Sequence, residues 1–213
     1  RAERAAQIKR SGAADMVLDA GPQSGKLVVE AVGISKAFDG QALLKEFSLK
    51  IARGERVAFV GPNGVGKTTL LKMLTGEVAP DTGHVRLGTG LEMAVFAQKR
   101  ESVPNDVAGR SDQVMVRGQP RHVVGYLKDF LFSEAQARGP VSALSGGEVA
   151  RLILARIMAR SSNLLVLDEP TNDLDVETLD LLQEILGDYP GTVMLVSHDR
   201  DFLDRVATTT IAM

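Results

Sequence analysis

The chain has 213 residues, of which 44% are hydrophobic and 24% charged, and its formal net charge is −2 at pH 7. This size and composition are typical of one globular domain, and the near-neutral charge gives no overall signature of nucleic-acid binding. The sequence contains no cysteine, which excludes a disulfide framework and thiolate zinc sites, and no apolar run of the roughly 18 residues that cross a bilayer.

The first residues predict a linker rather than part of a folded domain. The pattern over residues 1–10 is basic and helical, with a disordered tail as the alternative interpretation, and residues 12–26 form a loose connector. The chain begins at Arg1 rather than Met and stops at Met213 in a strand-like segment. We therefore expect a piece of a longer polypeptide, with a linker tail over residues 1–26 and one domain over residues 27–213.

Strands and helices alternate along this domain. In the first half, the patterning predicts strands at 26–38, 45–52, 56–60, 84–88 and 91–98, and a helix at 67–74. Residues 99–120 are polar and irregular, with a hairpin around Gly118, and helical spacing follows at 121–132 and 148–159. In the second half, continuous apolar strands at 163–170 and 191–199 alternate with helices at 175–189 and 200–207. This alternation predicts an α/β domain with a mainly parallel core sheet.

The segment "GPNGVGKTT" has the pattern of a phosphate-binding loop, G-x-x-x-x-G-K-[ST], and lies between a predicted strand and a predicted helix. In such a loop the backbone N–H groups wrap the phosphates, Lys67 reaches the β- and γ-phosphates, and the Thr68 hydroxyl binds Mg²⁺. A glycine-rich turn with a surface lysine is the alternative interpretation. The predicted nucleotide contacts are Gly61, Asn63, Gly64, Gly66, Lys67, Thr68 and Thr69.

Two carboxylates end the apolar strand of "NLLVLDEP". Asp168 is expected at the carboxyl edge of the sheet, beside the phosphate loop, where it can hold Mg²⁺. Glu169 follows directly and is expected to act on the attacking water, as a general base or as a positioning group. An ordinary loop start is the alternative for this pair, and the phosphate loop favours the catalytic interpretation.

Two further polar residues follow apolar strands. His198, in "VSHDR", is expected near the same sheet edge, where it can contact a γ-phosphate and help to orient the water. Gln98 ends the strand "EMAVFAQ" and is a candidate contact for Mg²⁺ or water. A structural histidine and an ordinary surface glutamine are the alternative interpretations.

The segment "LSGGE" begins a predicted helix. Ser145 and Glu148 have the spacing of a capping box. The adjacent glycines, Gly146 and Gly147, allow a close approach to a helix N-terminus, which attracts phosphates. A cap alone explains Ser145 and Glu148 but not the paired glycines.

Taken in order, the phosphate loop, Gln98, "LSGGE", "LLVLDEP", "NDLD" and "SHD" resemble the nucleotide-binding domains of the ABC ATPase superfamily, over residues 27–213. The resemblance implies an α/β P-loop fold with a mainly parallel core sheet, an antiparallel β subdomain and a helical subdomain that carries "LSGGE". It also implies that two such domains pack head to tail. Each ATP then lies between the phosphate loop of one domain and the "LSGGE" segment of the other.

The same resemblance assigns roles that the residues alone do not. Ser145, Gly146 and Gly147 are expected to contact the γ-phosphate of ATP on the neighbouring domain. Phe38 takes the place of the aromatic residue that stacks on adenine, although as a lone phenylalanine it could equally belong to the core. The segment that contains Asp173 and Asp175 is expected to communicate across the pair of domains.

The segments "EPTNDLD" and "SHDRDFLDRV" resemble those of the ABC-F group, and the segment "VMVRGQPRHVVGYLKDFLF" resembles that of its Uup-like branch. This resemblance implies a cytoplasmic Mg²⁺-dependent ATPase without membrane insertion, here the second ATPase domain with the end of the inter-domain linker. Its implied partner is the other ABC domain of the same polypeptide, or a homodimer mate for the isolated domain. ATP-driven closure would remodel a ribosome or another nucleic-acid complex, with DNA as a second possible target.

Three other functions are compatible with parts of this pattern. The ATP-driving subunit of a membrane transporter shares the core motifs, but the linker-like start and the segments "EPTNDLD" and "SHDRDFLDRV" count against it. A DNA-repair or chromosome ATPase usually carries long insertions or cysteine-rich zinc modules, which this chain lacks. A non-catalytic binding module is disfavoured because Lys67, Asp168, Glu169 and His198 are all present.

Overall fold

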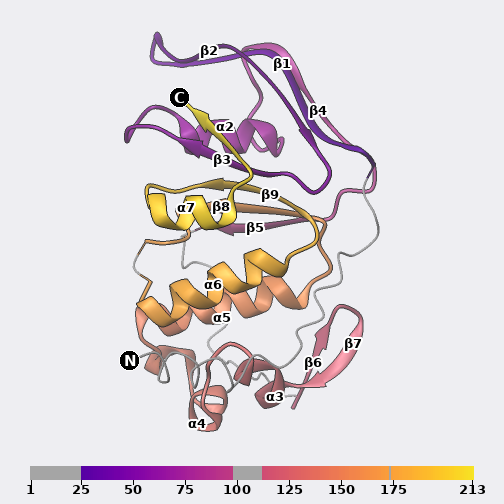
Figure 1. Cartoon of the computed structure of the whole chain (residues 1–213), viewed down its shortest axis with the longest axis vertical. Helices are drawn as coiled ribbons and strands as arrows, with labels where there is room; N and C mark the ends of the chain where they lie inside the picture. Colours follow the sequence, from indigo (N-terminus) through magenta and orange to yellow (C-terminus); the bar gives the residue numbers. More distant parts are fainter. Residues whose placement is uncertain (1–24, 98–111, 173) are drawn as a thin grey trace.

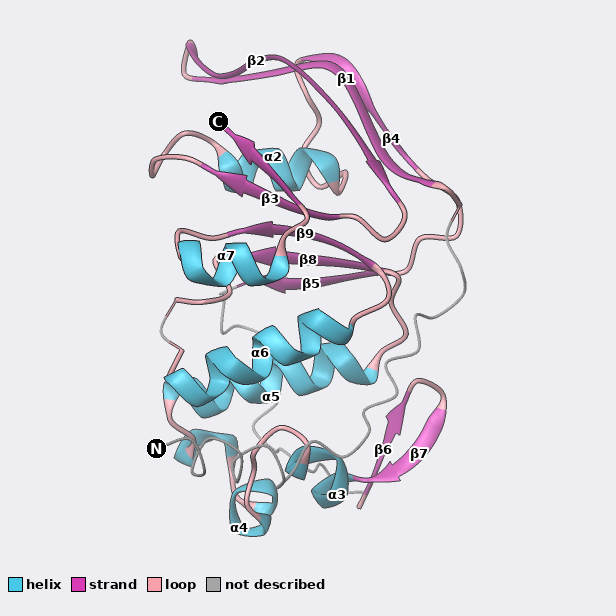
Figure 2. Cartoon of the chain, viewed as in Figure 1, coloured by secondary structure: helices cyan, strands magenta, loops and turns pink. Residues whose placement is uncertain are grey.

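The computed structural model describes residues 25–97, 112–172 and 174–213. Three sheets and the helices around them make up this part of the chain (Figures 1 and 2). The helix predicted for residues 1–10, most of the predicted linker, and Gln98 lie outside the described residues, so the predicted domain boundary at residue 27 stays a prediction. None of the helices in the described ranges is long and apolar enough to cross a membrane.

An antiparallel sheet forms one end of the molecule. It contains β1 (Leu27–Phe38), β2 (Gln41–Ala52) and β4 (Thr82–Leu87) in the order β2-β1-β4. The β1–β2 hairpin turns at Asp39 and Gly40, whose φ angles of 49° and 78° are those that a tight two-residue hairpin turn requires. Pairing with β1 therefore continues down to the turn, and β2 begins at Gln41 rather than at the predicted residue 45.

A five-stranded parallel sheet lies at the centre, as the sequence predicts. Its order is β10-β3-β9-β8-β5, and every neighbouring pair is parallel. The carboxyl ends of its strands therefore lie along one edge. The strands are β3 (Arg56–Val60), β5 (Met93–Ala97), β8 (Leu164–Asp168), β9 (Thr192–Val196) and β10 (Thr209–Ala212).

Alternate residues of these strands face two different hydrophobic clusters. Leu165 and Leu167 of β8 face the cluster formed with α5 (Gly146–Ala159), α6 (Val176–Asp188) and α7 (Arg200–Val206). Leu164 and Val166 face the opposite cluster, which contains residues of α2 (Lys67–Leu74) and of β1. Figure 1 shows α2 between the two sheets, with α5 and α6 on the far side of the parallel sheet. The central strands are buried on both faces, which explains their continuous apolar sequences.

A small helical region lies beyond α5. The hairpin predicted around Gly118 is confirmed as β6 (Gln113–Val116) and β7 (Gln119–His122). The helix predicted over 121–132 is wrong in extent. Arg121 and His122 pair with β6, and α3 spans only Val123–Lys128 before Leu131 adopts a φ of 63°. Two short helices, α4 (Glu134–Arg138) and η1 (Val141–Ala143), were not predicted.

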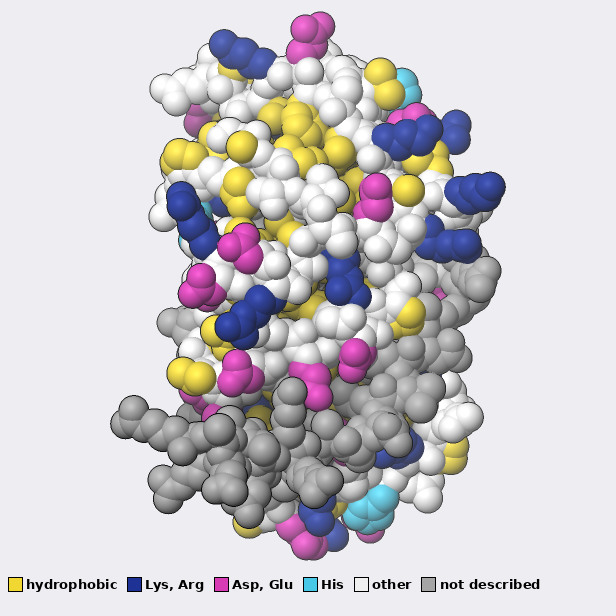
Figure 3. Space-filling view, viewed as in Figure 1, with side chains coloured by type: hydrophobic (Ala, Val, Ile, Leu, Met, Phe, Trp, Pro, Cys, Tyr) yellow, Lys and Arg dark blue, Asp and Glu magenta, His cyan; other side chains and the backbone are white. Residues whose placement is uncertain are grey.

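The outer surface carries charges of both signs. Figure 3 shows Lys and Arg side chains interspersed with Asp and Glu side chains on one face of the molecule. Across the antiparallel sheet, Glu30 lies between Lys50 and Arg86, at 3.7 and 3.9 Å. Exposed pairs of this kind contribute little to stability, so the folded state depends mainly on the two apolar clusters.

We predict that Leu165→Ala lowers the free energy of unfolding by about 2–5 kcal/mol, because it leaves a cavity between β8 and the helices. Leu165 is fully buried. The measurement is chemical denaturation followed by circular dichroism. The matched control is Val176→Ala, at a side chain that is 74% exposed, which should change stability by no more than about 0.5 kcal/mol. Equal effects of the two substitutions would contradict the assignment of this core.

Candidate nucleotide-binding site

The phosphate loop connects β3 to α2, and its glycines have backbone conformations that other residues rarely adopt. The φ angles are 155° at Gly61, 80° at Gly64 and 104° at Gly66. A Cβ atom at Gly66 would also lie 2.7 Å from the Leu43 Cγ atom. Leu43 belongs to β2, so the antiparallel sheet packs directly on the loop. No local pattern predicts this contact, because the sequence placed the start of strand β2 only at residue 45.

The N-terminus of α2 differs from those of the helices α4 to α7. Those four helices are capped by the side chains of Ser133, Ser145, Asp175 and Asp199. In contrast, α2 begins after Gly66, has no side-chain cap and has no acidic residue in its first turn. Its first N–H groups therefore have no side-chain acceptor of their own, which is the arrangement that attracts phosphate groups.

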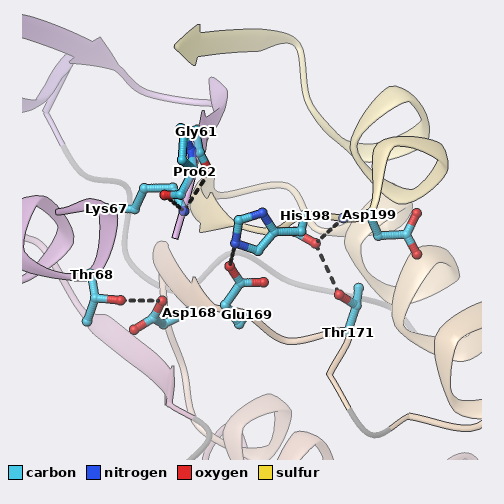
Figure 4. A network of polar contacts seen from close by, with 10 residues as sticks. Gly61, Pro62, Lys67, Thr68, Asp168, Glu169, Thr171, His198 and Asp199 are labelled. Atoms are coloured by element: carbon cyan, nitrogen blue, oxygen red, sulfur yellow. Dashed lines mark hydrogen bonds and ion pairs between the residues drawn. The ribbon is translucent and has the colours of Figure 1, made fainter. Parts of the chain in front are cut away.

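Lys67 brings a positive charge to this helix end. The residue is 6% exposed, and its Nζ atom donates hydrogen bonds to the carbonyl oxygens of Gly61 and Pro62, at 2.8 and 2.9 Å. Figure 4 shows the lysine side chain folded back along the loop toward these two residues. A lysine ammonium group has three donors, so one donor beyond the two loop carbonyls is available for a phosphate oxygen.

Thr68 and Asp168 meet beside the loop. The Thr68 hydroxyl donates a hydrogen bond of 3.1 Å to Oδ1 of Asp168 (Figure 4). Asp168 is the last residue of β8, and its backbone pairs with Val196 of β9 and Ala97 of β5. A hydroxyl and a carboxylate are oxygen ligands of the kind that Mg²⁺ prefers, so the donor set fits this ion. Gln98, the third predicted ligand, follows Ala97 and lies outside the described residues.

Glu169 and His198 form the other half of the site. His198 Nε2 lies 2.9 Å from Glu169 Oε1, and the side chains are 44% and 17% exposed. The second carboxylate oxygen, Oε2 of Glu169, is buried and has no hydrogen-bond partner among the described residues. Glu169 also has a φ of 48°, a strained conformation of the kind that clusters at functional sites. An acceptor that is buried and unsatisfied within the chain fits a water molecule or substrate group as its missing partner.

Phe38 is not part of the core, and the core alternative for this residue is therefore wrong. Its side chain is 51% exposed at the end of β1, beside the hairpin turn. The Lys36 ammonium group lies 5.6 Å from the centroid of the ring and is itself held by Asp81 at 2.7 Å. The ring is therefore an accessible flat surface on the same hairpin whose Leu43 contacts the phosphate loop.

The predicted capping box at the start of α5 is confirmed. The Ser145 hydroxyl accepts from the Glu148 N–H at 3.3 Å, and the Ser145 N–H donates to Oε2 of Glu148 at 2.6 Å. The backbone hydrogen bond from Ser145, followed by that from its side chain, lowers the pKa of Glu148 below its ordinary value. None of the hydrogen bonds or ion pairs in the described ranges joins this segment to the phosphate loop of the same chain.

The structure explains why position 147 is a glycine, which the sequence analysis did not foresee. A Cβ atom at Gly147 would lie 2.7 Å from Oδ2 of Asp175. Asp175 caps α6 by accepting a 2.8 Å hydrogen bond from the Thr178 N–H. The N-termini of α5 and α6 therefore meet at this point, and a contact within the chain explains one of the paired glycines. Asp173 lies outside the described residues.

The structure thus brings the predicted residues of the phosphate loop together with Asp168, Glu169 and His198, and it places the other described site residues elsewhere. Lys67, Thr68, Asp168, Glu169 and His198 lie at the carboxyl edge of the parallel sheet (Figure 4). Phe38 lies on the neighbouring hairpin. Ser145, Gly146 and Gly147 lie at the start of α5, outside this cluster.

Comparisons with known proteins identify the family of this chain. Residues 44–172 match the model of the ABC transporter family. The chain is 51% identical to ATP-binding protein Uup of Caulobacter vibrioides and 49% identical to that of Escherichia coli, over 97% and 98% of its length. It is 38% identical over 94% of its length to the energy-dependent translational throttle protein EttA of E. coli. The chain spans about a third of the length of these relatives, 35%, 34% and 37%.

Two solved structures share the fold. A metal-chelate type ABC transporter in an inward-facing conformation matches 88% of this chain and 79% of its own, with a TM-score of 0.69 and 21% identity. A dimeric ATP-binding cassette in a post-hydrolysis state, bound to ADP and Pi, matches 87% of this chain and 94% of its own, with a TM-score of 0.66 and 22% identity. The chain therefore belongs to the ABC transporter family, as an ATPase domain. Its sequence relatives place it with the Uup-like proteins of the ABC-F group.

We predict that Gly147→Ala lowers the free energy of unfolding by about 1–3 kcal/mol, because the added methyl group forces Asp175 away from the N-terminus of α6. The matched control is Gly187→Ala in α6, where a Cβ atom meets nothing within 4 Å. That control should be stabilising by up to about 1 kcal/mol, since alanine is the better helix former. Thermal and denaturant unfolding measure the change in the free energy of unfolding, which should have opposite signs in the two variants. A Gly147→Ala variant as stable as the parent would contradict the close approach of position 147 to Asp175.

Proposed function

We propose that this chain binds Mg²⁺ and ATP at the phosphate loop and hydrolyses the γ-phosphate bond, with Glu169 acting on the attacking water. One observation carries the proposal. The uncapped N-terminus of α2, the Lys67 ammonium group and the Thr68–Asp168 and Glu169–His198 pairs all belong to segments at the carboxyl edge of the parallel sheet. This edge is where open α/β sheets bind their ligands.

Each residue has a distinct role in this proposal. The first N–H groups of α2 and the Lys67 ammonium group bind the β- and γ-phosphates. Thr68 and Asp168, with Gln98, hold Mg²⁺, which neutralises the charge that develops on the phosphate oxygens. Oε2 of Glu169 accepts a hydrogen bond from the water and orients it for in-line attack. His198 donates to Oε1, which fixes the carboxylate, and it contacts the γ-phosphate. Phe38 stacks on adenine.

We further propose that a second ABC domain completes the site. Ser145, Gly146 and Gly147 then contact the γ-phosphate of ATP on that partner, and the segment with Asp173 and Asp175 links the two sites. The partner is the other domain of the same polypeptide, or a second copy of the isolated chain. Two facts support this proposal. The relatives are about three times as long as this chain, and the "LSGGE" segment makes no hydrogen bond to the phosphate loop within the described part of its own chain.

We predict that Glu169→Gln lowers kcat for ATP hydrolysis roughly 10²–10⁴-fold while ATP still binds, because the amide is a poor proton acceptor but keeps the size of the side chain. Steady-state phosphate release and ATP binding measure the two properties. The matched control, Glu184→Gln on the exposed face of α6, should keep the activity of the parent. An active Glu169→Gln variant would exclude the proposed role of Glu169.

The wider function we propose is that of a cytoplasmic ABC-F protein, in which ATP-driven closure remodels a ribosome or another nucleic-acid complex. The support is the similarity to the Uup proteins over nearly the whole chain and to EttA, whose name describes an action on translation. The alternative is the ATP-driving subunit of a membrane transporter. The fold shared with a metal-chelate type ABC transporter favours it, at 21% identity.

A co-sedimentation experiment separates these two functions. The Glu169→Gln variant, in the polypeptide that contains this chain, is incubated with cell lysate and ATP, and the ribosome and membrane fractions are collected. We expect the variant to sediment with ribosomes only when ATP is present, because hydrolysis no longer reopens the closed form. The parent protein with ADP is the control. Recovery with membranes, and not with ribosomes, would favour the transporter function and overturn the ABC-F proposal.

A further inference from the structure

Two loops carry the pair Glu169 and His198, and a contact outside this pair joins them. The loop after β8 contains Glu169 and Thr171, and the loop after β9 contains Ser197 and His198. The Thr171 and Ser197 hydroxyl oxygens are 3.0 Å apart, and either hydroxyl can donate to the other. Figure 4 shows Thr171 to the right of Glu169, with its hydroxyl pointing toward the loop that carries His198.

The Ser197 hydroxyl also shapes its own loop. It is 1% exposed and accepts a 3.1 Å hydrogen bond from the Asp199 N–H, so one side chain bridges the residues on both sides of His198. Asp199 in turn caps α7 by accepting from the Phe202 N–H at 3.0 Å. The backbone that carries His198 is therefore held at Ser197 and at Asp199, which fixes the point from which the imidazole ring reaches Glu169.

The loop after β8 needs such a restraint. Glu169 has a positive φ of 48°, and the turn that follows is closed by a weak hydrogen bond of 3.3 Å from the Asn172 N–H to the Glu169 carbonyl. The strand ladder between β8 and β9 ends with the Glu169 N–H, which donates to the Val196 carbonyl at 2.9 Å. Beyond that point, and apart from the Glu169–His198 pair itself, the Thr171–Ser197 contact is the hydrogen bond that joins the two loops among the described residues.

We infer that the Thr171–Ser197 hydroxyl pair is a positioning device for the proposed hydrolysis, holding the His198 loop in register with Glu169. This inference rests on the proposed function. Neither hydroxyl touches the reacting atoms, so both residues act through the Glu169–His198 pair. Losing the contact misplaces the group that orients the water but leaves the phosphate loop unchanged, and errors of about 1 Å in such positions cost up to roughly 10²-fold in rate.

The test compares Thr171→Val, which keeps the shape of the side chain but removes the hydroxyl, with Thr171→Ser, which keeps the hydroxyl. We expect Thr171→Val to lower kcat for ATP hydrolysis roughly tenfold or more with little change in KM, and Thr171→Ser to restore most of the rate. Ser197→Ala removes the Asp199 hydrogen bond as well as the Thr171 contact. Combining it with Thr171→Val should therefore cost no more than Ser197→Ala alone. Thr210→Val, on the exposed part of β10, is the matched control.

A second measurement does not depend on activity. Amide hydrogen exchange without nucleotide should be several-fold faster over residues 197–199 in Thr171→Val than in the parent, Thr171→Ser or Thr210→Val. The kinetics of ATP hydrolysis are measured in the polypeptide that contains this chain and its second ABC domain, and a parent polypeptide that hydrolyses no ATP would overturn the proposed function. An active parent whose Thr171→Val variant keeps the parental kcat, or loses kcat with no change in exchange at 197–199, would overturn this inference and leave the proposed function standing.

Discussion

The register between β8 and β9 is the constraint on which the candidate site depends. Asp168 pairs with Val196, so the two strands end level with each other, and the Glu169 N–H adds one further bond to the ladder. The polar residues that follow each strand consequently face one another across a single strand spacing. A shift of one residue in β8 would turn Leu165 and Leu167 out of their cluster, and the buried apolar side chains therefore determine where Glu169 and His198 meet.

The electrostatics of the site follow from differences between helix ends. The four helices α4 to α7 cap their first N–H groups with serine or aspartate side chains, whereas α2 follows Gly66 and has no side-chain cap. Lys67 adds a positive charge at that end, and the carboxylates of Asp168 and Glu169 face the space beside it. Positive groups that suit phosphates and acidic groups that suit a metal ion and water thus occupy opposite sides of one small region. A nucleoside triphosphate with its bound metal ion carries charges that match these two sides of the site.

Much of this arrangement could be predicted from the sequence, since local patterns determine it. The apolar runs of β8 and β9, the glycine loop before α2 and the Ser145–Glu148 spacing each describe a local structure, and each is present. The errors have non-local causes. Strand β2 begins earlier than predicted, at Gln41, because its first residues pair with β1. Arg121 and His122 are not helical as predicted, because they pair with β6. The contacts of Leu43 with Gly66 and of Thr171 with Ser197 join residues far apart in the chain, and no local pattern marks them.

The meeting of Gly147 with Asp175 has a consequence for how this sequence can vary. The two positions are 28 residues apart, yet one occupies the space that a side chain at the other would need. The effects of mutations here are therefore not additive, since contacting residues are energetically coupled. A side chain at position 147 either displaces the carboxylate of Asp175 or requires its loss, and both changes weaken the cap of α6. Each single substitution at this pair is thus unfavourable on its own, and the two positions are expected to vary as a pair.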